Sequence, residues 1–97
     1  MKMIYCTYNV SVQEEMEKIL KRTSVKNYQI FDNILAKAEG AQPRFNTPVW
    51  PGYNQVALIQ MDDSSPLIKE IKIYNRNEKD INEQILAYTW DVERPAD

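Results

Sequence analysis

One proline-containing segment in the middle of the chain combines the residue types that could hold a small ligand. Arg44 carries a planar guanidinium, which can bind a carboxylate or phosphate through two parallel hydrogen bonds. Asn46 adds an amide, and Trp50 and Tyr53 offer aromatic walls, with Gly52 between them to permit unusual backbone angles. We therefore predict that these five residues contact a ligand.

Structural roles compete with these assignments. Trp50 can instead pack under the loop and fix it, since aromatic residues beside prolines often act as structural plugs, and Arg44 can simply be solvated. Cys6 is a candidate metal or redox thiol, but a strand cysteine usually behaves as a small buried hydrophobe. Asp62 and Asp63 resemble a paired-carboxylate magnesium site, although followed by serines they fit a helix entrance better.

Composition restricts the function further. The chain has no histidine, which removes the commonest general base and metal ligand, so we predict no catalysis and no metal site, and the sequence names no cofactor. A net charge of −2 gives no attraction for a nucleic-acid backbone. The short apolar runs exclude a membrane span. One cysteine, and no apolar leader before the first strand-like pattern, lead us to expect a cytoplasmic protein.

Two helices and four strands must position these residues. The first helix should begin at the capping-box pattern Ser11-Val12-Gln13-Glu14. The second should follow Asp62–Pro66, with a serine cap and a proline in its first turn. The apolar stripes at helical spacing are Val12, Met16, Ile19 and Leu20, then Leu67, Ile68, Ile71 and Tyr74. We expect strands over Lys2–Asn9, Val25–Leu35, Gln55–Asp62 and Glu83–Val92, with a long loop over Glu39–Asn54.

This order, β-α-β-β-α-β, predicts one α+β domain over residues 1–97 with a ferredoxin-like fold. A four-stranded antiparallel sheet would carry both helices on one face. In the second strand we expect Tyr28, Ile30 and Ile34 on one side, opposite Phe31 and Leu35. The other strands carry apolar residues on both sides, so the helices leave an apolar face bare. We expect copies of the chain to cover it in a closed symmetric oligomer, with Tyr5, Tyr88 and Trp90 as interface residues.

The layout resembles the PII-like proteins, the trimeric superfamily around the nitrogen-regulatory PII proteins and the CutA divalent-cation-tolerance proteins. The motifs that carry the resemblance are Trp50-Pro51-Gly52-Tyr53-Asn54, leading into an apolar strand, and the closing Trp90-Asp91-Val92-Glu93. The chain is most similar to the small, largely uncharacterised PII-like group. It departs from nucleotide-binding PII proteins, because it has only Gly40 and Gly52 and no counterpart of their basic phosphate loops.

The resemblance implies a homotrimer that binds a small ligand or ion in clefts between subunits. The loop Ala36–Tyr53 would then signal to a protein partner. Three alternatives stay open: a CutA-like metal-tolerance protein, an assembly module in which the loop clasps a neighbouring subunit, and a small ferredoxin-like enzyme.

Overall fold

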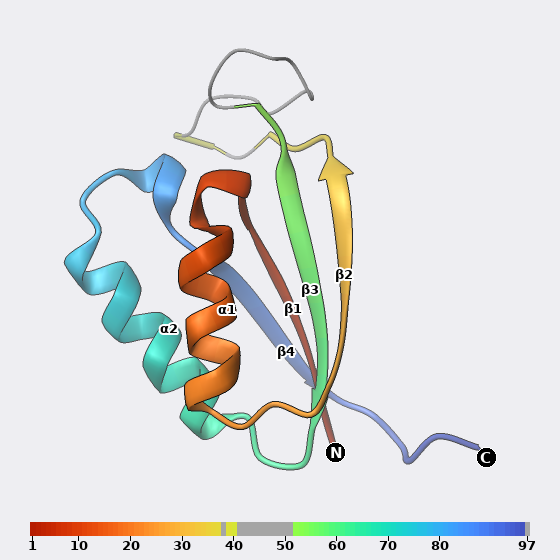
Figure 1. Cartoon of the computed structure of the whole chain (residues 1–97). Coiled ribbons are helices and arrows are strands. Elements are labelled where there is room, and N and C mark those ends of the chain that lie inside the picture. The colour runs from red at the N-terminus through yellow and green to blue at the C-terminus, as the bar shows by residue number, and fades with distance from the viewer. Residues whose placement is uncertain (38, 41–51, 97) are drawn as a thin grey trace.

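The computed structural model describes residues 1–37, 39–40 and 52–96. Along the chain (Figure 1) the elements are β1 (Lys2–Asn9), α1 (Gln13–Arg22), β2 (Asn27–Ile34), β3 (Asn54–Met61), α2 (Ser65–Asn77) and β4 (Leu86–Asp91). Two short 3-10 turns precede α1 and β4, namely η1 (Val10–Val12) and η2 (Ile81–Glu83). No helix among these residues has the length and apolar character needed to cross a membrane.

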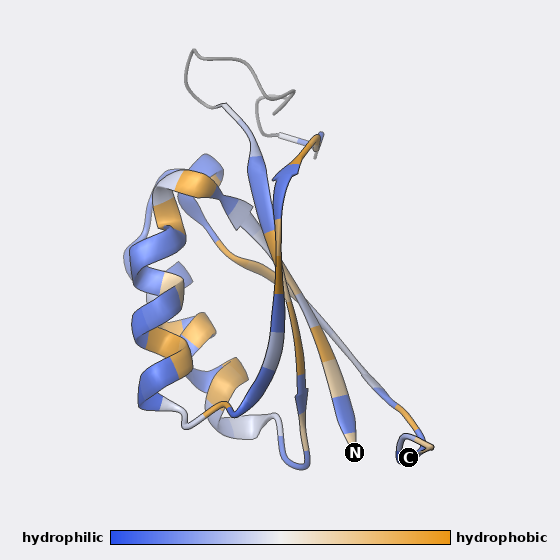
Figure 2. Ribbon diagram, turned by 45° about the vertical axis from the view of Figure 1, so that its right-hand side comes forward, coloured by the Kyte–Doolittle hydropathy of each residue, from blue (hydrophilic) through white to orange (hydrophobic). Residues whose placement is uncertain are grey.

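The strands form one antiparallel sheet in the order β2-β3-β1-β4. Both helices lie on the same side of it, and the opposite side carries no helix (Figure 2). The predicted ferredoxin-like α+β fold is therefore confirmed. We call the uncovered side the helix-free face.

The core lies between the sheet and the two helices. β1 contributes Ile4, Cys6 and Tyr8, which alternate along the strand and so point to one side of the sheet. Complete burial of such a side chain contributes about 1.5–3 kcal/mol. The helix residues that cover this layer are Val12, Met16, Ile19 and Leu20, with Leu67 and Ile71 from α2. The predicted stripes are confirmed, with Ile68 and Tyr74 only partly buried at the edge.

The start of α1 differs from the prediction. The expected capping box is wrong: Ser11 lies in η1, and its hydroxyl donates to Glu83 Oε2 at 2.5 Å. The backbone amide of Ser11 instead donates to Asn9 Oδ1 at 3.0 Å. The helix begins at Gln13, and Val12 at its N-cap offers no side-chain acceptor. The Ser11 hydroxyl is therefore bonded to Glu83, a residue distant in sequence, and does not cap the helix as the local pattern predicts.

The end of α1 is a Schellman motif built on a serine. The backbone amide of Val25 donates to Leu20 O at 3.1 Å, and that of Ser24 donates to Lys21 O at 3.2 Å. Ser24 takes φ of 56°, the left-handed conformation that glycine adopts with less strain. The hydroxyl of Thr23 also donates to the carbonyl oxygen of Ile19 at 2.8 Å.

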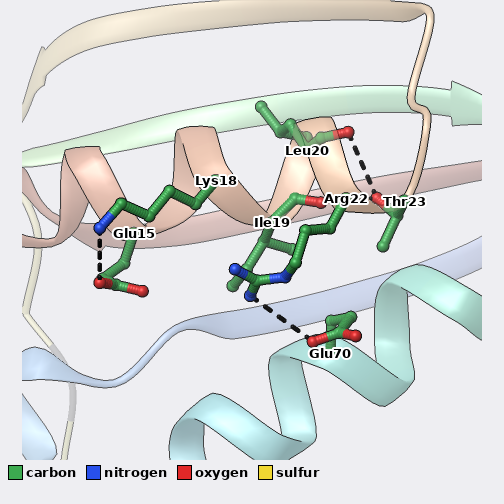
Figure 3. Close-up of polar contacts among 7 residues, drawn as sticks. All are labelled: Glu15, Lys18, Ile19, Leu20, Arg22, Thr23 and Glu70. Carbon is green, nitrogen blue, oxygen red and sulfur yellow. Dashed lines mark hydrogen bonds and ion pairs between the residues drawn. The ribbon is translucent and has the colours of Figure 1, made fainter.

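Charged side chains lie along the exposed surface of α1 (Figure 3). Lys18 pairs with Glu15 at 3.6 Å, one turn earlier. Arg22 reaches across to Glu70 on α2 at 3.5 Å. These pairs are at least partly solvated, so each contributes little to stability, typically about 0.2–1 kcal/mol.

The entrance of α2 uses an aspartate. Pro66 lies in the first turn and Ser64 occupies the N-cap position, both as predicted, but the Ser64 side chain makes no capping hydrogen bond. Asp63 Oδ1 accepts from the backbone amide of Ser65 at 3.0 Å. That hydrogen bond lowers the pKa of Asp63, because it favours the ionised carboxylate.

The connection from α2 to β4 is fixed by an asparagine. Asn75 Nδ2 donates to Ile85 O at 2.7 Å, and Asn75 Oδ1 accepts from the Ile85 amide at 2.8 Å. The Tyr74 hydroxyl donates to Glu83 O at 2.7 Å. The helix ends at Asn77, and β4 begins at Leu86, later than the predicted strand start at Glu83.

In β2, a bulge corrects the predicted alternation. Tyr28 and Ile30 pair with Ile59 and Ala57, so they lie on the helix side. The register then shifts between Phe31 and Ile34, where Asn33 takes φ of 57°. The extra residue places Ile34 opposite Asn54, on the same side as Phe31, so the predicted grouping of Ile34 with Tyr28 and Ile30 is wrong.

Candidate functional site

The helix-free face brings together all three residues that the sequence predicts at an interface. Tyr5 pairs with Tyr88 and Met3 pairs with Trp90 across β1 and β4, so all four side chains lie on this side of the sheet. The Tyr5 and Tyr88 rings have centroids 6.4 Å apart, tilted by 48°. Tyr88 is 55% exposed and Trp90 44% exposed.

Other strands extend this apolar surface. Leu86 on β4 and Phe31 on β2 lie on the same face and are also exposed, and Leu58 on β3, opposite Tyr5, lies on this face as well. Large apolar side chains that gather on one face usually mark a binding surface. A hollow of about 400 Å³ opens on this side near the start of β2, and Met3, Gln29, Leu58 and Gln60 are among its lining residues.

Of the five predicted ligand residues, the structure describes only Gly52 and Tyr53, at the C-terminal end of the loop. Gly52 takes φ of 67°, which confirms the expected unusual backbone angle. Tyr53 is half-buried, and its carbonyl oxygen accepts from the Val10 amide at 3.1 Å, which joins the loop to η1. Arg44, Asn46 and Trp50 lie outside the described residues, so their assignment as ligand contacts stays a prediction.

Two buried asparagines, to which the sequence patterns assign no role, lie where the loop enters β3. Asn54 is opposite Asn9 in the sheet, and both are buried. Asn54 Nδ2 donates to Thr7 Oγ1 at 2.8 Å. Buried amides of this kind are hydrogen-bonded and fix one geometry. Asparagines at strand ends are the only signal in the sequence, and such residues are equally common in turns.

Cys6 and the acidic pair do not form reactive sites. Cys6 is buried on β1, and burial raises its pKa to about 12, so it stays a thiol; its interpretation as a buried hydrophobe is confirmed. Asp63 caps α2 and Asp62 lies 3.9 Å from Arg94, so the helix-entry interpretation of Asp63 is also confirmed. Within residues 1–37, 39–40 and 52–96, no three His, Cys, Asp or Glu side chains gather into a possible metal site.

Solved structures share this fold. CPII from Thiomonas intermedia K12, bound to ADP and bicarbonate, superimposes with a TM-score of 0.68 at 16% identity, over 97% of this chain and 89% of that one. Its apo form gives 0.62 at 18% identity, over 97% and 92%. This chain has the PII-like fold. A Thermus thermophilus protein with a proposed PII-like signaling role gives 0.59 at 18% identity, over 94% and 85%.

Comparison by sequence does not identify a family for this chain. No protein-family model matches the chain, and no curated protein matches it. CPII is described as a nitrogen regulatory PII-like protein. At these identities the PII-like structures are evidence for the architecture, and their ligands belong to those proteins.

Proposed function

We propose that this chain is a non-catalytic PII-like regulatory protein. It assembles as a homotrimer through the helix-free face and binds a small ligand or ion in clefts between subunits. The loop over residues 36–53 then signals occupancy to a protein partner. The observation that carries the proposal is the exposed apolar surface of the helix-free face, on a fold shared with ligand-bound CPII.

The apolar side chains of the helix-free face need a partner to cover them. Two helices shield only one side of the sheet, while Tyr88, Trp90, Leu86 and Phe31 are each more than two-fifths exposed on the other. Burial of apolar area stabilises at about 25 cal/mol per Å². A closed ring of identical chains covers the surface of every copy, because each chain presents the same patch.

The loop root, which is the C-terminal end of the loop at Tyr53 and Asn54, is fixed to neighbouring elements. The Tyr53 carbonyl is bonded to Val10, and the neighbouring Asn54 is bonded to Thr7 on β1. A ligand near Gly52 and Tyr53 would therefore act on a segment whose C-terminal end is fixed to the sheet. If two conformations of the loop make different contacts with the ligand, binding shifts the population toward the conformation with the better contacts. A partner that recognises one conformation can then detect whether the ligand is bound.

Sedimentation and calorimetry test the two halves separately. Sedimentation velocity at micromolar concentration should give a trimer. Isothermal titration with ADP, AMP, magnesium and bicarbonate should then show heat for at least one of them, and loss of that heat in Arg44→Ala. A monomeric wild-type chain removes the intersubunit cleft, and a trimer that binds none of the panel argues against the sensing role.

The assembly-module alternative is separated by shortening the loop. Replacement of residues 41–51 by a short glycine-serine linker should leave the trimer intact if the loop signals. Loss of the trimer would show that the loop clasps the neighbouring subunit instead.

A further inference from the structure

The helix side of the sheet carries a cavity that is formed within a single chain. A cavity of about 270 Å³ opens between α1 and β2. Met16 and Leu20 form its wall on α1, and Tyr28 and Ile30 form its wall on β2. Tyr28 is 49% exposed and Ile30 40% exposed although both lie on the helix side, because α1 does not extend over this edge strand. The size and the apolar walls suit a small molecule.

A chain of hydrogen bonds crosses the cavity lining and ends in a carboxylate on each side. Gln55 Nε2 on β3 donates to Asp32 Oδ1 on β2 at 2.7 Å and to Gln13 Oε1 on α1 at 3.0 Å. Gln13 Nε2 then donates to Glu17 Oε1 at 3.3 Å. All four residues line the cavity. Both ends of the chain therefore offer acceptor oxygens.

Gln55 adds an acceptor that the protein leaves unused. Its side chain is 4% exposed, and among the described residues its Oε1 is the buried side-chain polar atom that has no hydrogen-bond partner. A buried polar atom without a partner is costly, and native structures contain few. Exchange of the amide oxygen and nitrogen would not help, because the oxygen would then face Asp32 Oδ1 and Gln13 Oε1, two further acceptors. The excess of acceptors is thus independent of the amide orientation.

Tyr8 forms the cavity floor on β1. Burial, followed by the negative charges of Asp32 and Glu17, raises the pKa of Tyr8, so its hydroxyl stays neutral. Lys21, which also lines the cavity, is exposed to solvent. The cavity therefore combines an apolar middle with two carboxylates and an unsatisfied amide oxygen.

We propose that this cavity binds a small molecule that carries a protonated amine on a short apolar body. The ammonium takes the place of Gln55 Nε2 and donates to Asp32 Oδ1 and Gln13 Oε1, the two acceptors of that group, and its third proton is accepted by Gln55 Oε1. Rotation of the Gln55 amide presents this oxygen once the ligand replaces Nε2 at Asp32. The apolar body packs against Met16 and Ile30. Every contact comes from one chain, so ligand binding in this cavity does not require the intersubunit cleft of the proposed trimer.

Titration with butylammonium tests the proposal by nuclear magnetic resonance of the intact protein. Butanol and butyrate serve as neutral and anionic probes of nearly the same shape, at constant ionic strength. Butylammonium should shift the side-chain amide signals of Gln55 and Gln13 and the backbone signal of Ile30. Asp32→Asn should weaken its binding about tenfold, the cost of losing one charged hydrogen bond. Glu14→Gln removes the same charge on α1 outside the cavity and should leave the affinity within about twofold.

Three outcomes would overturn the proposal. Equal shifts from butanol, butyrate and butylammonium would show an apolar cavity without preference for a cation. No shift of the cavity signals in the folded protein would show that only water occupies it. Unchanged affinity in a folded Asp32→Asn variant, judged by its dispersed spectrum, would show that the ammonium binds elsewhere.

Discussion

Replacement of Tyr88 by lysine should separate assembly from folding. Tyr88 lies on the helix-free face with 55% of its surface exposed, so the isolated chain makes limited use of it. In a trimer closed through this face, the same ring would be buried against a neighbouring copy. A lysine there would bring a charge into that interface, where desolvation without a partner is costly.

The expected magnitudes differ strongly between the two processes. An aromatic side chain buries about 150–250 Å² when fully covered, so the exposed part of Tyr88 corresponds to about 100 Å². At about 25 cal/mol per Å² this is about 2.5 kcal/mol per subunit, or about 7.5 kcal/mol for three. The isolated chain loses mainly the ring contact with Tyr5, which contributes about 1 kcal/mol.

Sedimentation velocity and urea unfolding in the same buffer measure both effects. The Tyr88→Lys variant should sediment as a monomer at concentrations where the wild type is a trimer, with unfolding free energy lower by about 1 kcal/mol apart from the loss of subunit linkage. Ile73→Lys is the matched control, because Ile73 is also apolar and exposed but lies on α2, away from the helix-free face. A Tyr88→Lys trimer of wild-type stability would refute the assignment of this face to the interface.

Further predictions concern the fold. Asn75→Ala removes both hydrogen bonds to Ile85 and should lower the unfolding free energy by about 2 kcal/mol. Asn77→Ala, at the exposed end of the same helix, should lower it by less than about 0.5 kcal/mol. Equal losses in the two variants would show that the Asn75 side chain does not fix the connection to β4. Ser24→Gly should raise the unfolding free energy by up to about 1 kcal/mol, because the left-handed backbone strains serine, and a loss would show that the serine has another role. Cys6 should resist alkylation by iodoacetamide in the native protein and react readily in urea, since burial raises its pKa to about 12; rapid native labelling would contradict its burial.

The strands and their faces could be predicted from sequence because the apolar alternation is local. In β1 the period of two separates Ile4, Cys6 and Tyr8 from Met3 and Tyr5, and the structure keeps that division. Poor amphipathicity of the strands was itself informative, because it predicted an uncovered apolar face. In β2 the same rule fails beyond Phe31, since a bulge changes which side each later residue occupies.

The polar network could not be predicted in the same way. Ser11 matches a capping pattern, yet its hydroxyl bonds to Glu83, a residue 72 positions away. Gln55 bonds to residues 42 and 23 positions away, Gln13 and Asp32. Such partners are set by the packing of three different elements and leave no local signal. The cavity between α1 and β2 has the same origin, because it depends on how far the helix reaches over the edge strand.

Asn54 and Gln55 connect the two proposed sites through one peptide. They are adjacent at the start of β3, so their side chains point to opposite faces of the sheet. Asn54 bonds to Thr7 beside the helix-free face, and Gln55 bonds to Asp32 in the cavity. A ligand that displaces Gln55 therefore acts on β3, the strand that follows the loop directly and contributes residues to the helix-free face. Coupling between binding sites is reciprocal, so butylammonium should bind the trimer and the Tyr88→Lys monomer with different affinities, and equal affinities would show that β3 does not connect them.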